Sequence, residues 1–145
     1  VLEHFDYQKG KEIIEECYRV LKPNGIVRIS MPDLDFYLEN MSNEIDREIQ
    51  DFIMEHKKSF IELKDCPSNM NTMLNFIINS CGHKYVYRAQ TFIKLAKELG
   101  FKNAMQVEPG RTEYEEFDYL EDNTMGRHAG AKNHLIQTMA LEANK

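Results

Sequence analysis

The 145-residue sequence predicts an α/β domain with three strands and a helical insert after the first strand. Two helix-then-strand pairs are visible, at 9–31 and 89–108, and a last strand at 134–143 follows without a helix. A strand–helix–strand unit crosses over to run its strands in the same direction. A strand that returns without such a crossover can only pair antiparallel to a neighbour. We therefore expect the last strand to run against the other two.

The first helix and strand are separated by a clear break. Apolar residues recur at helical spacing from 9 to 21, which predicts an amphipathic helix. Pro23 cannot continue that helix, and Asn24-Gly25 tolerates the positive φ of a tight turn. The β-branched run from Ile26 to Met31 is typical of a buried strand.

Residues 34–88 form the predicted helical insert. One amphipathic helix is expected at about 43–64, and Pro67-Ser68 ends it. A second is expected from Met70, with apolar residues at i, i+3, i+4 and i+7, up to the break at Gly82.

Residues 89–143 are expected to form a helix, a strand, a loop and a last strand, in that order. A helix is predicted at 89–99 with Gly100 just beyond its end, followed by a strand at 103–108. Residues 111–132 are polar and without periodicity, so we expect mostly loop. The last strand, 134–143, has partly alternating apolar residues.

Composition narrows the classes of function. The net charge of −6 gives no general attraction to nucleic acid or anionic lipid. No apolar run approaches the ~20 residues of a membrane-spanning helix, and no signal peptide is visible. Cys17, Cys66 and Cys81 are too widely spaced for a disulfide framework or for the paired cysteines of a zinc site, so no metal is expected. These features favour a cytoplasmic protein.

Several short motifs together resemble the carboxyl-terminal half of a class I S-adenosylmethionine-dependent methyltransferase. They are Glu3-His4, Arg19 to Pro23, Met31 to Leu34, His83 to Tyr85, Gly100-Phe101 and Leu141 to Ala143. The resemblance implies a single partial domain over 1–145, with the last three strands of a Rossmann-like sheet and a reversed final strand between the other two. It also implies that the insert, 34–88, is a lid or substrate wall. Asn24 departs from the usual glycine, and its short side chain tolerates the left-handed conformation.

Ligands of open α/β sheets bind beyond the carboxyl ends of the parallel strands. Four segments of this chain should meet there: Glu3-His4, Asp33 with Asp35, His83 to Tyr85, and Arg127-His128. Histidines, carboxylates and a tyrosine at one rim could act as general acids, bases or orienting groups. The candidate catalytic residues are His4, Asp33 and His83; the candidate substrate-binding residues are Tyr85, Arg127 and His128; and Glu3 with His4 could contact the cofactor.

Each candidate also has a purely structural interpretation. His4 could cap a turn, and Asp33 could be the N-cap of the following segment. His83 and Tyr85 could pack the insert against the sheet, and Arg127-His128 could be solvated loop residues. Outside this set, we interpret His56 as structural and Met70 and Met73 as core.

The family's cofactor-binding residues are missing from the sequence. The glycine-rich loop after the family's first strand and the acidic residue after its second have no counterpart, and the seven glycines include no G-x-G spacing. We therefore expect S-adenosylmethionine to be the cofactor of a full-length parent, and this chain to be a truncated form that does not bind it with useful affinity. The sequence does not indicate which molecule accepts the methyl group.

A second hypothesis is a non-enzymatic interaction module. If the family's preceding strand is absent, the strand at 26–31 has an unpaired apolar edge, which is a template for pairing with another chain. This interpretation predicts a homodimer joined through that edge.

Overall fold

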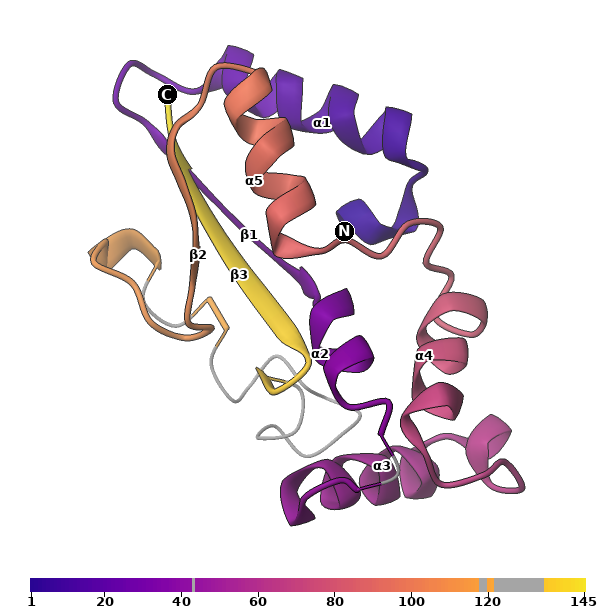
Figure 1. Cartoon of the computed structure of the whole chain (residues 1–145). Coiled ribbons are helices and arrows are strands. Elements are labelled where there is room, and N and C mark those ends of the chain that lie inside the picture. Colours follow the sequence, from indigo (N-terminus) through magenta and orange to yellow (C-terminus); the bar gives the residue numbers. More distant parts are fainter. Residues whose placement is uncertain (43, 118–119, 122–134) are drawn as a thin grey trace.

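The computed structural model describes residues 1–42, 44–117, 120–121 and 135–145 (Figure 1). Its elements, in chain order, are the one-turn 3-10 helix η1 (Leu2–His4), α1 (Tyr7–Val20), β1 (Ile26–Pro32), α2 (Leu34–Glu39), α3 (Arg47–Ser59), η2 (Ile61–Leu63), α4 (Met70–Asn79), α5 (Ala89–Glu98), β2 (Lys102–Val107), η3 (Glu115–Phe117) and β3 (Thr138–Asn144). The predicted α/β class is confirmed. Among the described residues, no helix is long and apolar enough to cross a membrane.

The three strands form one sheet in the order β1-β3-β2. β3 pairs antiparallel with both neighbours, so β1 and β2 run in the same direction on either side of it. The predicted reversed strand between two parallel strands is therefore confirmed. β1 lies at one edge of the sheet, where its residues are mostly half-buried.

Local sequence signals explain where the helices beside the sheet begin and end. The Asp6 carboxylate accepts a hydrogen bond from the Lys9 amide and caps the start of α1. Asn24 takes the left-handed conformation, with φ of 62°. At the end of α5, Gly100 has φ of 100°, and the Gly100 and Phe101 amides donate to the carbonyls of Lys97 and Ala96. These two bonds form a Schellman motif, in which glycine is favoured because it has no Cβ.

One core lies between the sheet and the helices α1 and α5. Met139, Leu141 and Ala143 of β3 point to this face and are fully buried with Ile14 of α1 and Leu95 of α5. Because side chains alternate along a strand, the even-numbered residues of β3 point to the opposite face.

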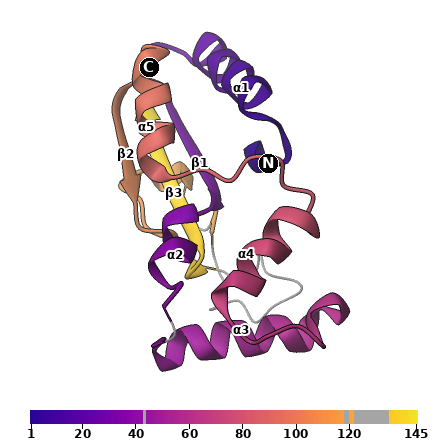
Figure 2. The same cartoon turned by 45° about the vertical axis from the view of Figure 1, so that its right-hand side comes forward.

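A second core holds the insert together, beyond the carboxyl end of β1 (Figures 1 and 2). Tyr37 of α2 and Phe52 of α3 are fully buried in it, as are Met70 and Met73 of α4, which confirms the core interpretation of these two methionines. His56 is also buried, and its Nδ1 lies 2.9 Å from the Phe52 carbonyl oxygen, in keeping with a structural role.

Two sequence-predicted boundaries in the insert are wrong. A single helix was expected at 43–64, but α3 covers only Arg47–Ser59, because Asp46 caps its start and Phe60 is extended. The short helix α2 was not predicted at all, because six residues are too few to show a helical period.

The start of the last strand also differs from its prediction. Pairing begins at Thr138, because Leu135 is helical and Ile136 and Gln137 form a turn, while residue 134 lies outside the described residues. Ile136 packs against the insert core, and the Gln137 side chain accepts a hydrogen bond from the Tyr37 hydroxyl. These contacts with the insert hold the segment out of the sheet.

The other face of the sheet carries a buried charge network. Arg28 of β1 lies directly opposite Glu142 of β3, and its guanidinium donates to the carboxylates of both Glu142 and Glu121. The Arg28 and Glu121 side chains are 1% and 4% exposed. The Ser30 hydroxyl and the Gly110 amide also donate to Glu121, at 2.8 and 2.9 Å. The network therefore ties the segment after β2 to this face.

The charge network shifts the pKa of Glu121. Burial acts to raise this pKa, but the hydrogen bonds from Arg28, Gly110 and Ser30 outweigh burial and hold it below its ordinary value of 4.5. A carboxyl whose pKa is lower in the folded than in the unfolded state stabilises the fold at a pH above the unfolded value. That contribution is lost as the pH falls through the folded pKa.

Replacement of Arg28 by methionine tests this network. Arg28→Met leaves two carboxylates buried without their cation, so we expect unfolding free energy to fall by about 3–5 kcal/mol at neutral pH. The deficit should shrink as the pH falls below 4.5, the ordinary value, and through the lower folded pKa of Glu121, because the stabilisation from the ionised carboxylate is lost over that range. Urea titration from pH 3 to 7 measures both effects.

Arg19→Met is the matched control, because the Arg19 side chain is 70% exposed and, among the described residues, forms an ion pair only with Glu16 on the helix surface. It should cost less than about 1 kcal/mol. Equal effects of the two substitutions would contradict the assigned role of Arg28.

Candidate functional site

The amino-terminal turn η1 and the segment 82–88 are held side by side by backbone hydrogen bonds. The Glu3 carbonyl oxygen accepts from two amides, those of Lys84 at 2.7 Å and Tyr85 at 3.2 Å. Gly82, with φ of 73°, makes the turn that leads into this segment. The motifs Glu3-His4 and His83-Lys84-Tyr85, which lie about 80 residues apart in the sequence, are thereby brought together.

His4 is held in one tautomer by its neighbour. Its Nδ1 lies 3.3 Å from the Gly82 carbonyl oxygen, which can only accept, so Nδ1 carries the proton. Its Nε2 therefore has a free lone pair, and it lies 3.6 Å from Glu3 Oε1. The His4 side chain is 48% exposed, so Nε2 is a group that could accept a proton from a ligand or bind a metal.

His83 packs against His4, edge to face, with ring centroids 4.8 Å apart. Its Nδ1 is buried and has no hydrogen-bond partner among the described residues. Burial lowers the pKa of His83 and outweighs the opposing attraction of Glu3, while nearby His4 lowers the pKa further. The ring is therefore neutral at neutral pH, and Nδ1 can be a lone-pair donor.

Three tyrosines form an aromatic cluster beside the histidines. The Tyr85 ring centroid lies 5.2 Å from that of Tyr7 and 4.6 Å from that of Tyr87. Tyr87 is fully buried, and its hydroxyl finds no hydrogen-bond partner among the described residues. Burial raises the pKa of Tyr87 to about 12, and the neighbouring tyrosines add to the shift. Tyr85 thus packs against α1 and against its own segment.

The carboxyl end of β1 carries a second polar group. Asp33 caps α2, because its Oδ1 accepts from the Asp35 amide at 2.9 Å, and its Oδ2 lies 3.4 Å from the Gln106 amide nitrogen. Burial, with a smaller effect of Asp35, raises the pKa of Asp33. Arg88 donates to Asp35 at 2.6 Å. The N-cap interpretation of Asp33 is confirmed.

The segment 82–88 connects these two groups. Its first residues contact η1, while its Tyr87 carbonyl accepts from the Leu34 amide at 3.0 Å and Arg88 pairs with Asp35. The predicted meeting of Glu3-His4 with His83 is therefore direct, and Asp33 joins them only through this segment. The predicted residues Arg127 and His128 lie outside the described part of the chain.

Sequence reasoning missed two members of the second group, Arg88 and Gln106. Arg88 directly precedes a predicted helix, and Gln106 lies within a predicted strand, so each had an ordinary structural explanation. Only the folded chain shows that they bracket the two aspartates.

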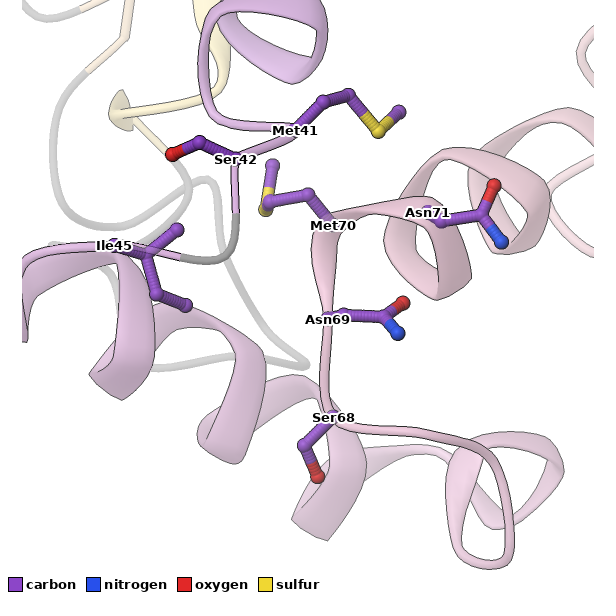
Figure 3. A pocket seen from close by; sticks show the side chains of 7 residues that line it. All are labelled: Met41, Ser42, Ile45, Ser68, Asn69, Met70 and Asn71. Carbon is purple, nitrogen blue, oxygen red and sulfur yellow. The ribbon is translucent and has the colours of Figure 1, made fainter.

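A pocket of about 240 Å³ lies in the insert, and none of the predicted site residues that the structure describes lines it (Figure 3). Its polar groups already serve the fold: Asn69 caps α4, and Ser68 accepts a hydrogen bond from Lys57. Its lining contains no titratable side chain, so the chemistry of this chain is better placed at the histidines. The lining residues are Met41, Ser42, Ile45, Ser68, Asn69, Met70 and Asn71.

Comparison with known proteins found matches only among solved structures. No protein-family model and no curated protein matches the chain. Among solved structures, the chain is similar to a SAM-dependent methyltransferase from Archaeoglobus fulgidus, with 16% sequence identity and a TM-score of 0.48. The match covers 99% of this chain and 55% of that one, so the chain spans about half the length of that structure.

The close approach of α1 to Tyr87 gives a testable double substitution. A Cβ at Gly10 would lie 2.2 Å from the Tyr87 hydroxyl oxygen but 3.5 Å from the ring carbon that carries it. Gly10→Ala should therefore destabilise the fold by about 1–3 kcal/mol, as overpacking does. Tyr87→Phe removes an unpaired buried hydroxyl and should be neutral or stabilising.

The double variant should be at least as stable as the unsubstituted protein, because alanine is favoured over glycine in a helix by about 1 kcal/mol. Thermal denaturation of all four proteins completes the cycle. If Tyr87→Phe did not relieve the cost of Gly10→Ala, the proposed contact would be wrong.

Proposed function

We propose that this chain is the carboxyl-terminal part of a S-adenosylmethionine-dependent methyltransferase. The single observation that carries the proposal is the sheet order, in which β3 runs antiparallel between the parallel strands β1 and β2. That is the arrangement that the sequence resemblance implies for the end of the family's sheet. The insert lies beyond the carboxyl end of β1, where ligands of open α/β sheets bind (Figure 2).

The residues of this chain do not fit the cofactor. Its described glycines with positive φ, Gly82, Gly100 and Gly110, each stand alone at a turn or helix end. They do not build the continuous glycine-rich cradle through which a backbone approaches a nucleotide. We therefore assign no cofactor contact beyond Glu3 and His4, and no chemical step through the cofactor.

Within this proposal, His4 is the best candidate for handling a proton of the methyl acceptor. Its Nδ1 proton is donated to the Gly82 carbonyl, which leaves the partly exposed Nε2 free to accept a proton. Asp33 is less suited, since both of its carboxylate oxygens have partners in the fold. We assign Asp33 a positioning role and leave His83 and Tyr85 as walls of the site.

Titration calorimetry with S-adenosylmethionine tests the assignment of the cofactor site. We expect the 145-residue chain to show no stoichiometric binding, because it has no glycine-rich cradle. Clear one-to-one binding by this chain alone would overturn the expectation that it lacks the cofactor half.

The gene sequence upstream of the Val1 codon tests the parent activity separately. A glycine-rich strand–turn–helix encoded there, and cofactor binding by the extended protein, are the expected results. An upstream sequence without that motif would contradict the methyltransferase proposal.

The alternative is a homodimeric interaction module. Among the described residues, β1 has a strand on one side only, so its other edge is open to a second copy. In this case we expect a dimer mass in light scattering at micromolar concentration, with amide exchange in 26–31 slower in the dimer. A monomer mass would contradict the alternative.

A further inference from the structure

Three potential metal ligands meet where η1 contacts the segment after α4. Glu3, His4 and His83 each offer one ligand atom, and these atoms all lie within 4.8 Å of one another. Their elements are fixed by the two amide bonds to the Glu3 carbonyl and by the contact of His4 with Gly82. The cluster therefore belongs to a defined part of the fold.

Neighbouring groups orient the potential ligand atoms of His4 and Glu3. His4 Nδ1 is engaged by the Gly82 carbonyl, which orients Nε2 in the way that a carbonyl orients a metal-bound histidine. Glu3 Oε2 accepts from the Val1 amino group at 2.7 Å, while Oε1 faces His4 Nε2.

The buried nitrogen of His83 is the observation that points to a ligand. Its Nδ1 is shielded from solvent and has no hydrogen-bond partner among the described residues. A buried polar atom without a partner is costly, and a bound ion is one of the few explanations for its presence in a native fold.

We propose that Glu3, His4 and His83 bind a divalent transition metal ion, with Zn²⁺ as the best match. Two imidazoles and one carboxylate are a known ligand set for zinc with an open fourth position, and nitrogen ligands disfavour Mg²⁺ and Ca²⁺. At metal–ligand distances of about 2.0–2.2 Å, the donors of one tetrahedral ion lie about 3.4 Å apart, so ligand atoms that are up to 4.8 Å apart here would have to approach one another by up to about 1.4 Å. The absence of paired cysteines does not bear on this ligand set.

The remaining coordination position would be open to water or to a ligand. His4 is about half exposed, so the cluster is accessible from solvent. Tyr85 and Tyr87 lie on the same segment as His83 and pack with Tyr7 of α1, and this aromatic cluster would form an apolar wall near the ion. The metal site does not rest on the methyltransferase proposal, but the two assign different roles to His4: an ion bound to Nε2 would occupy the lone pair that would otherwise accept a proton.

Titration calorimetry of the metal-free protein with Zn²⁺ tests the site. We expect one-to-one binding that EDTA reverses, and at least about tenfold weaker binding in His83→Ala, because even outer-sphere substitutions have effects of that size. Glu12→Gln is the matched control: it removes an exposed carboxylate of α1, paired with Lys9, and should leave Zn²⁺ affinity unchanged. Absence of Zn²⁺ binding, or binding unaffected by His83→Ala, would overturn the proposal.

A second measurement needs no substitution. Imidazole nitrogen resonances of the unsubstituted protein should shift on Zn²⁺ addition for His4 and His83, and not for His56, which is buried in the insert core. Zn²⁺-dependent shifts that spare His4 and His83 would also overturn the site. This readout separates loss of the metal site from loss of the fold.

Discussion

The pairing of β3 with two strands at once is the constraint on which the rest of the fold depends. Among the described residues, β1 and β2 are joined in one sheet only through the backbone of β3. The apolar face of β3 completes the core with α1 and α5, and its other face supplies Glu142 to Arg28. A strand buried on both faces must satisfy both an apolar and a charged neighbour. That double requirement explains why the buried Glu142 stands between the apolar residues Leu141 and Ala143.

The two polar centres of the molecule, the Arg28 network and the pair of histidines, have different roles. Arg28 is enclosed by carboxylates and hydrogen-bond donors, so every charge in that network has a partner, and the network serves the fold. At the histidines the opposite holds, because His83 Nδ1 is buried and unpaired and His4 Nε2 is partly exposed. Unpaired donors and acceptors in a fixed frame are typical of binding sites. We therefore place function at the second centre.

Much of the fold could be predicted because the residues that end its helices act through their own local backbone preferences. Pro23, Asn24 and Gly100 end their helices by their own backbone preferences. The antiparallel direction of β3 followed from the missing crossover helix, whereas its position between β1 and β2 was implied only by the family resemblance. The start of β3 could not be predicted, because the apolar side chain of Ile136 is as typical of a strand as of the contact that it makes. In the structure Ile136 packs against the insert core. For the candidate site, the sequence predicted that Glu3-His4 and His83 lie at the same rim of the sheet. It could not find the pairing of Asp35 with Arg88, because long-range ion pairs leave no periodic signal.

The central position of β3 has a consequence for how the chain reaches this state. β1 and β2 are synthesised well before β3, and Ile26 pairs with Asn144, more than a hundred residues later. Until β3 emerges from the ribosome, neither strand has its described partner, and the apolar faces of α1 and α5 lack the strand that covers them. Such long-range pairing folds slowly and leaves strand edges open to aggregation. Nascent chains of this protein should therefore depend on chaperones more than its finished structure suggests.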